Sequence, residues 1–149
     1  MIYIGIDPGK SGAMALVWPD GQPATGVCRF DATPTDQADW LLGFDLTQAV
    51  AVIERVSSSP QMGVVSAFSF GKSQGFLLGL LTALKIPYHE VTPQKWQKAM
   101  GCMSGGDKNV TKHAAQKLWP HLKITHRDAD ARLIAEYGRR FINNGGASR

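Results

Sequence analysis

The sequence predicts one α/β domain built around a mixed five-stranded sheet. Three short apolar segments near the start of the chain are separated by tight-turn residues, which indicates an antiparallel meander. Residues 49–54 are almost entirely apolar, as expected for a central parallel strand that is buried on both faces. Helical and strand segments alternate after this point, and that order is typical of a sheet sandwiched between helices.

Each predicted element follows from local signals. The strands are expected at about 1–7, 13–18, 25–30, 49–54 and 86–91. Proline at position 87 places the last strand at an edge of the sheet, because proline has no N–H for a second neighbour. A short helix is expected after the capping pair Thr33-Pro34 and a long one over about 64–85. Three more helices follow the capping residues Thr92, Asp107 and Thr125 and run to about 100, 119 and 142.

The totals describe an ordinary globular chain. Its 149 residues are 44% hydrophobic and 19% charged, so we expect a single folded domain over residues 1–149. No signal peptide is visible, and the apolar run 76–84 is interrupted by Gly79 and is too short to span a bilayer. The two cysteines lie far apart in the sequence, which is typical of reduced thiols. We therefore expect a cytoplasmic protein without a membrane partner.

Charge is distributed unevenly along the chain. Residues 1–84 contain 4 Lys/Arg and 7 Asp/Glu, a net charge of −3, whereas residues 85–149 contain 12 and 5, a net charge of +7. Basic residues in the second part recur at helical spacing, which favours a polyanionic partner such as nucleic acid. The alternative interpretation is an ordinary solvated surface.

Acidic residues stand at the ends of two predicted strands. Asp7 precedes the turn Pro8-Gly9, and Glu54 ends the apolar strand 49–54. A buried carboxylate is costly unless a cation neutralises it, and ligands gather at the carboxyl ends of parallel strands. Asp128 and Asp130 add two more acids near the start of the last helix. An all-carboxylate set selects Mg²⁺, with Mn²⁺ as a substitute, rather than Zn²⁺.

Residues 5–12, Gly-Ile-Asp-Pro-Gly-Lys-Ser-Gly, resemble the opening motif of RuvC-type Holliday-junction resolvases, which belong to the RNase H-like nuclease superfamily. The resemblance continues in order through most of the chain, at Val52-Ile53-Glu54, Val91-Thr92-Pro93, the glycine-containing loop before Lys108, and Asp130-Ala131. It implies an RNase H-like fold and a Mg²⁺-dependent homodimer that nicks two strands of a four-way DNA junction symmetrically, leaving 5′-phosphate ends. The short chain is similar to phage or prophage members, which implies the cytoplasm of a bacterium or of a phage-infected host.

The resemblance also implies catalytic and metal-binding roles for Asp7, Glu54, Asp128 and Asp130. In the family the two helix acids are usually three residues apart, but Arg127 occupies that position here. Asp128 is two residues before Asp130, and a step of two turns about 200° around a helix. Thr125 and Asp128 instead have the spacing of a capping box. Asp128 as cap and Asp128 as metal ligand both remain open, and His126, four residues before Asp130, is an auxiliary candidate.

Relatives place an aromatic residue three positions after the glutamate, where it wedges into the junction, but this chain has Ser57 there. Met62 is an alternative, whereas Phe68 and Phe70 are expected in the core. The residues predicted to bind DNA are Lys95, Lys98, Lys108 and Lys112, because their charges follow helical spacing. Trp96 and Trp119 are predicted to be core residues rather than platforms for bases.

Other interpretations of the chain stay open. A nuclease for other branched DNA or for RNA would have similar motifs, and a junction-binding protein that does not cut would follow if the altered helix motif had lost the metal. Residues 70–73, Phe-Gly-Lys-Ser, end like a P-loop but lack glycine at position 66, so we expect no nucleotide cofactor. Gly71, Gly75 and Gly79 form a stripe on the long helix, which predicts a packing surface in the core or in a dimer.

Overall fold

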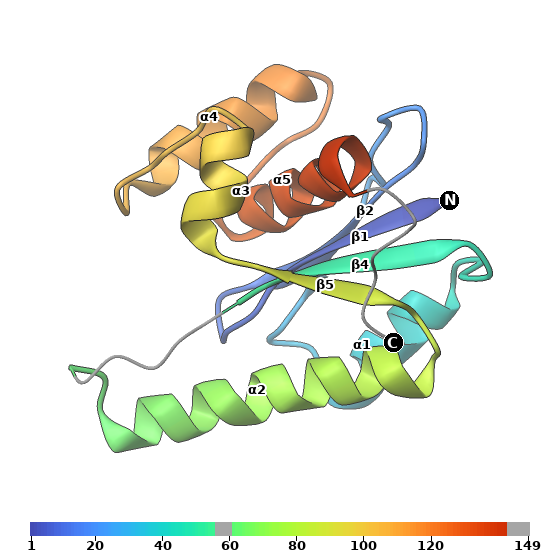
Figure 1. The fold of residues 1–149 in the computed structure, drawn as a ribbon, viewed down its shortest axis with the longest axis vertical. Helices are drawn as coiled ribbons and strands as arrows, with labels where there is room; N and C mark the ends of the chain where they lie inside the picture. Colours follow the sequence, from blue (N-terminus) through green and yellow to red (C-terminus); the bar gives the residue numbers. More distant parts are fainter. Residues whose placement is uncertain (56–60, 143–149) are drawn as a thin grey trace.

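A computed structural model describes residues 1–55 and 61–142 of the chain. Its centre is a five-stranded sheet with the strand order β3-β2-β1-β4-β5 (Figure 1). The strands are β1 (Ile2–Asp7), β2 (Ala13–Val17), β3 (Cys28–Arg29), β4 (Ala49–Glu54) and β5 (Tyr88–Val91). β2 is antiparallel to both β1 and β3, whereas β4 is parallel to both β1 and β5. The predicted mixed sheet is confirmed, including β5 at an edge.

The third strand is much shorter than predicted. A strand was expected over 25–30, but only Cys28–Arg29 pairs with β2. The carbonyl oxygens of Ala24 and Thr25 instead accept hydrogen bonds from the guanidinium of Arg132, at 2.7 and 3.0 Å. A side chain from a distant helix therefore satisfies two backbone carbonyls in the segment that precedes β3. The last strand likewise begins at Tyr88 rather than at residue 86.

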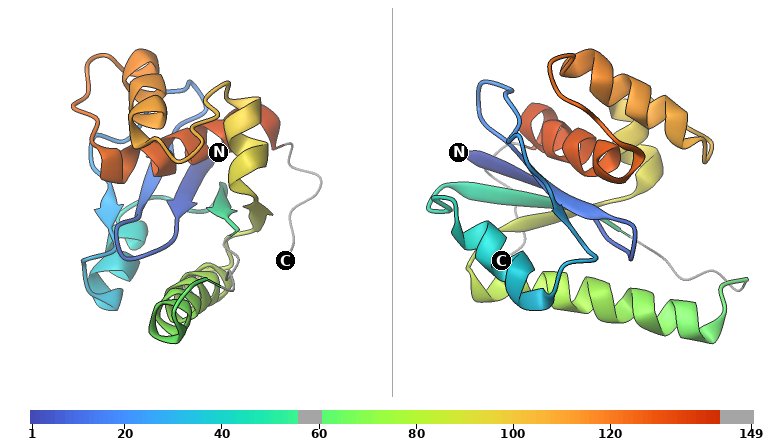
Figure 2. Two further views of the ribbon diagram at one scale, coloured as in Figure 1. Left: turned by 90° about the vertical axis from the view of Figure 1, so that its left-hand side faces the viewer. Right: turned by 180° about the vertical axis from the view of Figure 1, so that it is seen from behind.

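Five helices cover the two faces of the sheet (Figures 1 and 2). They are α1 (Pro34–Leu42), α2 (Val64–Ala83), α3 (Pro93–Ala99), α4 (Lys108–Leu118) and α5 (His126–Phe141). The helices α1 and α2 lie on one face, where Leu41, Leu77 and Leu81 pack against the apolar side chains of the central strands. The other three lie on the opposite face, where Trp96, Ala115 and Leu133 form a second apolar layer with Val52 and Val91.

The contact between α5 and β1 is unusually close. A Cβ atom added at Gly5 would overlap the carbonyl oxygen of Ala131 and the amide nitrogen of Ala135, so only glycine allows the helix backbone to lie directly on the strand. A second glycine, Gly138, lies near the C-terminal end of α5 and approaches a side chain of β4. A Cβ atom added at Gly138 would lie 2.9 Å from Cγ2 of Val52. These two glycines fix the height and the direction of α5 above the sheet.

The long helix α2 exposes much of its apolar surface. Phe68 is 74% exposed and Val64 and Val65 are exposed as well, so the predicted core position of Phe68 is wrong. No other atom lies within 4 Å of a Cβ built at Gly71, Gly75 or Gly79, which leaves the glycine stripe uncovered in the described part of the chain. By length and composition alone α2 would also suffice to cross a membrane, and only 11% of its apolar window is buried.

Candidate active site

Two of the predicted acids lie side by side at one edge of the sheet. The parallel register of β1 and β4 pairs Ile6 with Ile53, so Asp7 and Glu54 are the next residues on adjacent strands. Both strands end here, which is where the chain turns away and leaves room for a ligand. The predicted proximity of these two carboxylates is therefore a consequence of sheet register.

Asp130 reaches the same edge from the opposite layer. It lies in the second turn of α5, which is held against β1 by the contact at Gly5. Its side chain is 5% exposed and its Oδ2 forms an ion pair with Nζ of Lys108. Its Oδ1 is buried and has no hydrogen-bond partner among the described residues. A buried carboxylate oxygen without a partner is unusual in proteins and marks a place where a cation or a donor would be stabilised.

The carboxylates influence one another electrostatically. Burial, together with the negative charges of Glu54 and Asp130, raises the pKa of Asp7 to about 7, although Lys108 partly opposes the shift. Burial also raises the pKa of Glu54, against the hydrogen bond that this side chain accepts from Trp96. Burial alone would lower the pKa of Lys108, but the hydrogen bond and the charge of Asp130, with those of Asp7 and Glu54, raise it. The three acids therefore share one electrostatic site that is deficient in positive charge.

Lys108 enters this site from the start of α4. The preceding Asp107 caps the helix by accepting a hydrogen bond from the Asn109 amide at 2.9 Å. The loop before it contains Gly105 and Gly106, both with positive φ, and this turn directs the chain into α4. Lys108 was predicted as a DNA-binding residue after the glycine-containing loop, and the structure pairs its ammonium with Asp130 among the acids.

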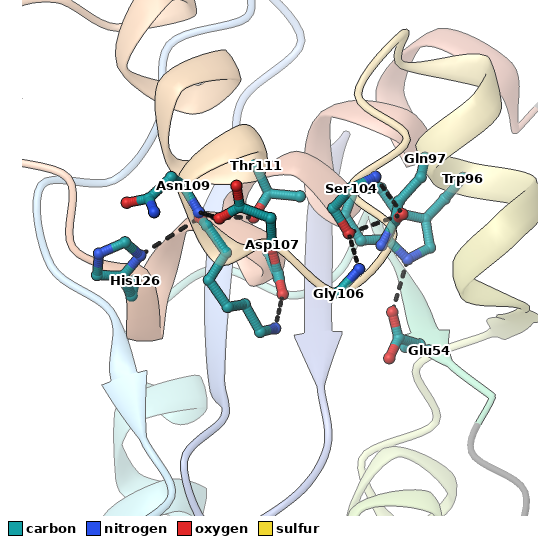
Figure 3. A network of polar contacts seen from close by, with 11 residues as sticks. Glu54, Trp96, Gln97, Ser104, Gly106, Asp107, Asn109, Thr111 and His126 are labelled. Carbon is teal, nitrogen blue, oxygen red and sulfur yellow. Dashed lines mark hydrogen bonds and ion pairs between the residues drawn. The ribbon is translucent and has the colours of Figure 1, made fainter.

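Trp96 is a member of the site that the sequence did not reveal. Its indole N–H donates a hydrogen bond to Oε2 of Glu54 at 2.6 Å, and the two side chains face each other in Figure 3. The prediction that Trp96 is buried is confirmed, since its side chain is fully inaccessible. The two residues are 42 positions apart, and no local pattern predicts which acceptor a buried indole will find.

Asp128 points elsewhere. Its Oδ1 accepts hydrogen bonds from the backbone amide of Thr125, at 2.9 Å, and from the Thr125 hydroxyl, which completes the predicted capping box. Its Oδ2 lies 3.8 Å from Nε of the buried Arg132. Of the two alternatives, the structure therefore shows the cap, and it does not bring Asp128 together with the other three acids. The cause is the two-residue step around the helix, which separates Asp128 from Asp130.

The remaining predicted residues lie around the site or outside it. His126 is exposed, and its Nδ1 lies 3.3 Å from the carbonyl oxygen of Lys108 (Figure 3). Lys95 and Lys98 are exposed on α3, and Lys112 is half-buried on α4. Their contact with DNA stays a prediction. Ser57 lies outside the described residues.

The chemistry of the acids suits a hard divalent cation, but their arrangement does not hold one as it stands. Within residues 1–55 and 61–142, no group of three or more Asp, Glu, His or Cys side chains is arranged so that it could hold a metal ion, and the ammonium of Lys108 provides the positive charge beside Asp130. The donor set of Asp7, Glu54 and Asp130 consists only of carboxylate oxygens, which suits Mg²⁺ or Mn²⁺. The unpartnered Oδ1 of Asp130 and the raised pKa of Asp7 are the features that such a cation would relieve.

Comparison with solved structures identifies the fold. Thermus thermophilus RuvC in complex with a Holliday junction substrate is similar with a TM-score of 0.66 and 17% sequence identity, over 99% of this chain and 98% of that one. A second structure of Thermus thermophilus RuvC is similar with a TM-score of 0.63 and 18% identity, over 99% of each chain. The chain therefore has the RuvC variant of the RNase H-like fold over nearly its full length. No family model matches the sequence, and no curated protein sequence matches it.

The raised pKa of Asp7 predicts how stability depends on pH without metal. Asp7 titrates near 3.8 when unfolded and at about 7 when folded, so the folded state holds the extra proton between these values. The free energy of unfolding should therefore fall as pH rises from 4 to 7. In EDTA, Asp7→Asn should be more stable than wild type by about 2–4 kcal/mol at pH 8, with little difference near pH 4.

Urea unfolding followed by circular dichroism at both pH values would measure this difference. Asp39→Asn, at an exposed position of α1, is the matched control and should follow the wild-type profile. A pH-independent difference between Asp7→Asn and wild type would contradict the electrostatic assignment.

The two aspartates of α5 should respond differently to the same substitution. Asp128→Asn weakens the cap and leaves Arg132 without its carboxylate. The free energy of unfolding should therefore fall by about 1–2 kcal/mol. Asp130→Asn should instead abolish binding of Mn²⁺, measured by isothermal titration calorimetry, while Asp128→Asn retains it. Loss of Mn²⁺ binding in Asp128→Asn, with the fold intact, would restore Asp128 as a ligand.

Proposed function

We propose that this protein is a metal-dependent, structure-selective endonuclease that resolves four-way DNA junctions by paired, symmetric nicks. The observation that supports it most strongly is the convergence of Asp7, Glu54 and Asp130 from β1, β4 and α5 at one sheet edge, with Lys108 beside them. The same fold in a RuvC bound to a Holliday junction supports the choice of substrate. Neither observation alone indicates the reaction.

The chemistry follows from what the acids can hold. Asp7, Glu54 and Asp130 would bind Mg²⁺ or Mn²⁺, which supplies activation of a water molecule and charge neutralisation for phosphodiester displacement. Asp130 offers its unpartnered Oδ1, and Asp7, whose pKa is raised to about 7, offers a carboxyl group whose ionised form a bound cation would stabilise. The expected products are a 5′-phosphate and a 3′-hydroxyl.

Lys108 has two roles in this proposal. Its side chain is 59% exposed although its ammonium pairs with Asp130, so it lies at the mouth of the site. The ion pair neutralises part of the excess negative charge while the acids are free. If a cation bound Asp130, the ammonium of Lys108 would be available to the phosphate next to the scissile bond, whose negative charge would attract it.

The basic helices beside the site form the proposed path for DNA arms. α3 presents Lys95 and Lys98 to solvent on the helix whose buried Trp96 contacts Glu54. α4 adds Lys112 one turn beyond Lys108. These lysines would contact phosphates without reading the base sequence, so binding should weaken steeply with salt.

Paired cuts require two active sites, and α2 is the proposed contact between two copies of the chain. Its exposed apolar side chains, Val64, Val65 and Phe68, need a cover, and the open glycine stripe allows another helix to approach closely. A two-fold dimer would match the two-fold symmetry of a four-way junction. A membrane is the competing cover for an apolar helix of this length.

The proposed dimer predicts the effect of a charge on α2. Phe68→Asp should convert a dimer into a soluble monomer, because burying the new carboxylate at the interface is unfavourable. Analytical ultracentrifugation would measure the mass, and Asp39→Asn again serves as the control. A wild-type protein that is monomeric in buffer and sediments with lipid vesicles would overturn the dimer in favour of a membrane.

The nuclease prediction is tested by nicking of a labelled four-way junction and of the matching linear duplex in Mg²⁺. Wild type should cut the junction in pairs, and Asp7→Asn should lose about 100-fold or more in rate, because it removes a ligand from the charge-stabilising site. Asp39→Asn should cut like wild type. Equal cutting of linear duplex would exclude junction selectivity, and junction binding without metal-dependent cleavage would favour a non-cleaving junction-binding protein.

A further inference from the structure

The hydrogen bond between Trp96 and Glu54 joins a fully buried side chain to a candidate metal ligand. The indole N–H lies 2.6 Å from Oε2 of Glu54, and Trp96 has no exposed surface. An indole N–H is a donor only, so its sole contribution at this position is to hold an acceptor. Such a short bond to a carboxylate is of the charge-assisted kind, which restricts the rotation of the acid.

The local structure around the end of β4 places this contact in the first turn of α3. Glu54 pairs with Val91 at the end of the parallel register between β4 and β5. Thr92 caps α3 and Pro93 begins it, so the chain turns into a helix immediately after this pair. The first turn of α3 then places Trp96 above the strand end. A strand pair and a helix cap therefore direct the indole to Glu54.

The next residue on α3, Gln97, holds the loop that precedes α4. Oε1 of Gln97 accepts hydrogen bonds from the amide and the hydroxyl of Ser104, both at 3.2 Å, and the Ser104 hydroxyl accepts one from the Gly106 amide at 3.2 Å (Figure 3). This loop leads directly into Lys108. Consecutive residues of one short helix therefore hold Glu54 and the loop that delivers the lysine.

We infer that Trp96 is a positioning residue for the metal site, which holds Oε2 of Glu54 and presents Oε1 as the oxygen that binds the cation. The inference rests on the proposed function, because it assigns the role of Trp96 within that same site. It predicts that metal affinity depends on an indole that touches neither metal nor DNA. Partners of ligating carboxylates commonly tune metal affinity in this way.

Trp119 provides a matched control within the same chain. It is also buried, and its indole N–H donates a hydrogen bond at 3.0 Å, but the acceptor is the backbone carbonyl of Gly21. Trp96→Phe and Trp119→Phe therefore delete the same donor from similar surroundings and leave an aromatic ring. Only the first deletion removes a contact to a candidate ligand.

The first measurement is Mn²⁺ binding by isothermal titration calorimetry, without DNA. Trp96→Phe should weaken binding by about 10–100-fold, the usual effect of losing a partner of a metal ligand, whereas Trp119→Phe should leave it within about twofold. Circular dichroism and urea unfolding confirm that both variants are folded. Equal affinity in wild type and folded Trp96→Phe would overturn the inference.

A double-mutant cycle separates positioning from general damage to the fold. In a Glu54→Gln background, Trp96→Phe should cause little further loss of Mn²⁺ affinity, because its effect passes through the Glu54 carboxylate. The same fractional loss with and without that carboxylate would show a merely structural role and would refute the proposal.

A measurement on wild type keeps the inference testable if Trp96→Phe does not fold. In protein labelled with ¹⁵N at the indole nitrogens, addition of Mg²⁺ should shift the N–H resonance of Trp96 and leave that of Trp119 unchanged. Trp18→Phe, Trp40→Phe and Trp119→Phe identify three of the four indole resonances, and the remaining one belongs to Trp96. Mg²⁺ binding without a shift at Trp96 would overturn the positioning role alone, whereas a wild-type protein that binds neither Mg²⁺ nor Mn²⁺ would refute the proposed function itself.

Discussion

The close packing of α5 on β1 is the constraint on which the candidate site depends. At Gly5 the helix backbone lies where any side chain would stand, and this height places Asp130 next to the end of β1. Asp7 and Glu54 are brought together by sheet register alone, but a third acid has to come from the layer above. A bulkier residue at position 5 would lift the helix and separate the acids without changing any of them.

The site concentrates like charges that folding by itself would avoid. Burial and the neighbouring acids raise the pKa of Asp7 to about 7, and Lys108 compensates only in part. An arrangement that is unfavourable for the isolated protein and favourable with a cation present is common at functional sites, because the ligand supplies the missing interaction. By contrast, the buried carboxylate of Glu136, away from this site, is paired with both Arg139 and Arg140.

The two faces of the sheet have different surfaces. The face of α3, α4 and α5 contains Asp130, the lysines and the buried indoles, and the hydrogen bond from Trp96 to Glu54 connects α3 to the end of β4 (Figure 3). The face of α1 and α2 is apolar, and α2 extends this apolar character to solvent at Phe68. If two copies of the chain associated through α2 and nucleic acid bound at α3 and α4, the two interfaces would lie on opposite faces of the sheet and would not overlap.

The sequence by itself determined the sheet, the helices and the proximity of Asp7 and Glu54, because each depends on short-range patterns, whereas Asp130 was predicted from the resemblance to a family. Turn residues separate the first strands, capping residues begin the helices, and Asp7 and Glu54 end strands that pair in parallel. The tertiary structure decided the rest through contacts between residues that are far apart in the chain. Arg132 binds the backbone carbonyls of Ala24 and Thr25, more than 100 positions away. The packing of α5 on β1 brought Asp130 to the strand ends, and packing of α3 and α4 brought Trp96 to Glu54 and Lys108 to Asp130. A capping box and a buried tryptophan are visible in a sequence, but the partner of a buried polar group is fixed only when the layers meet.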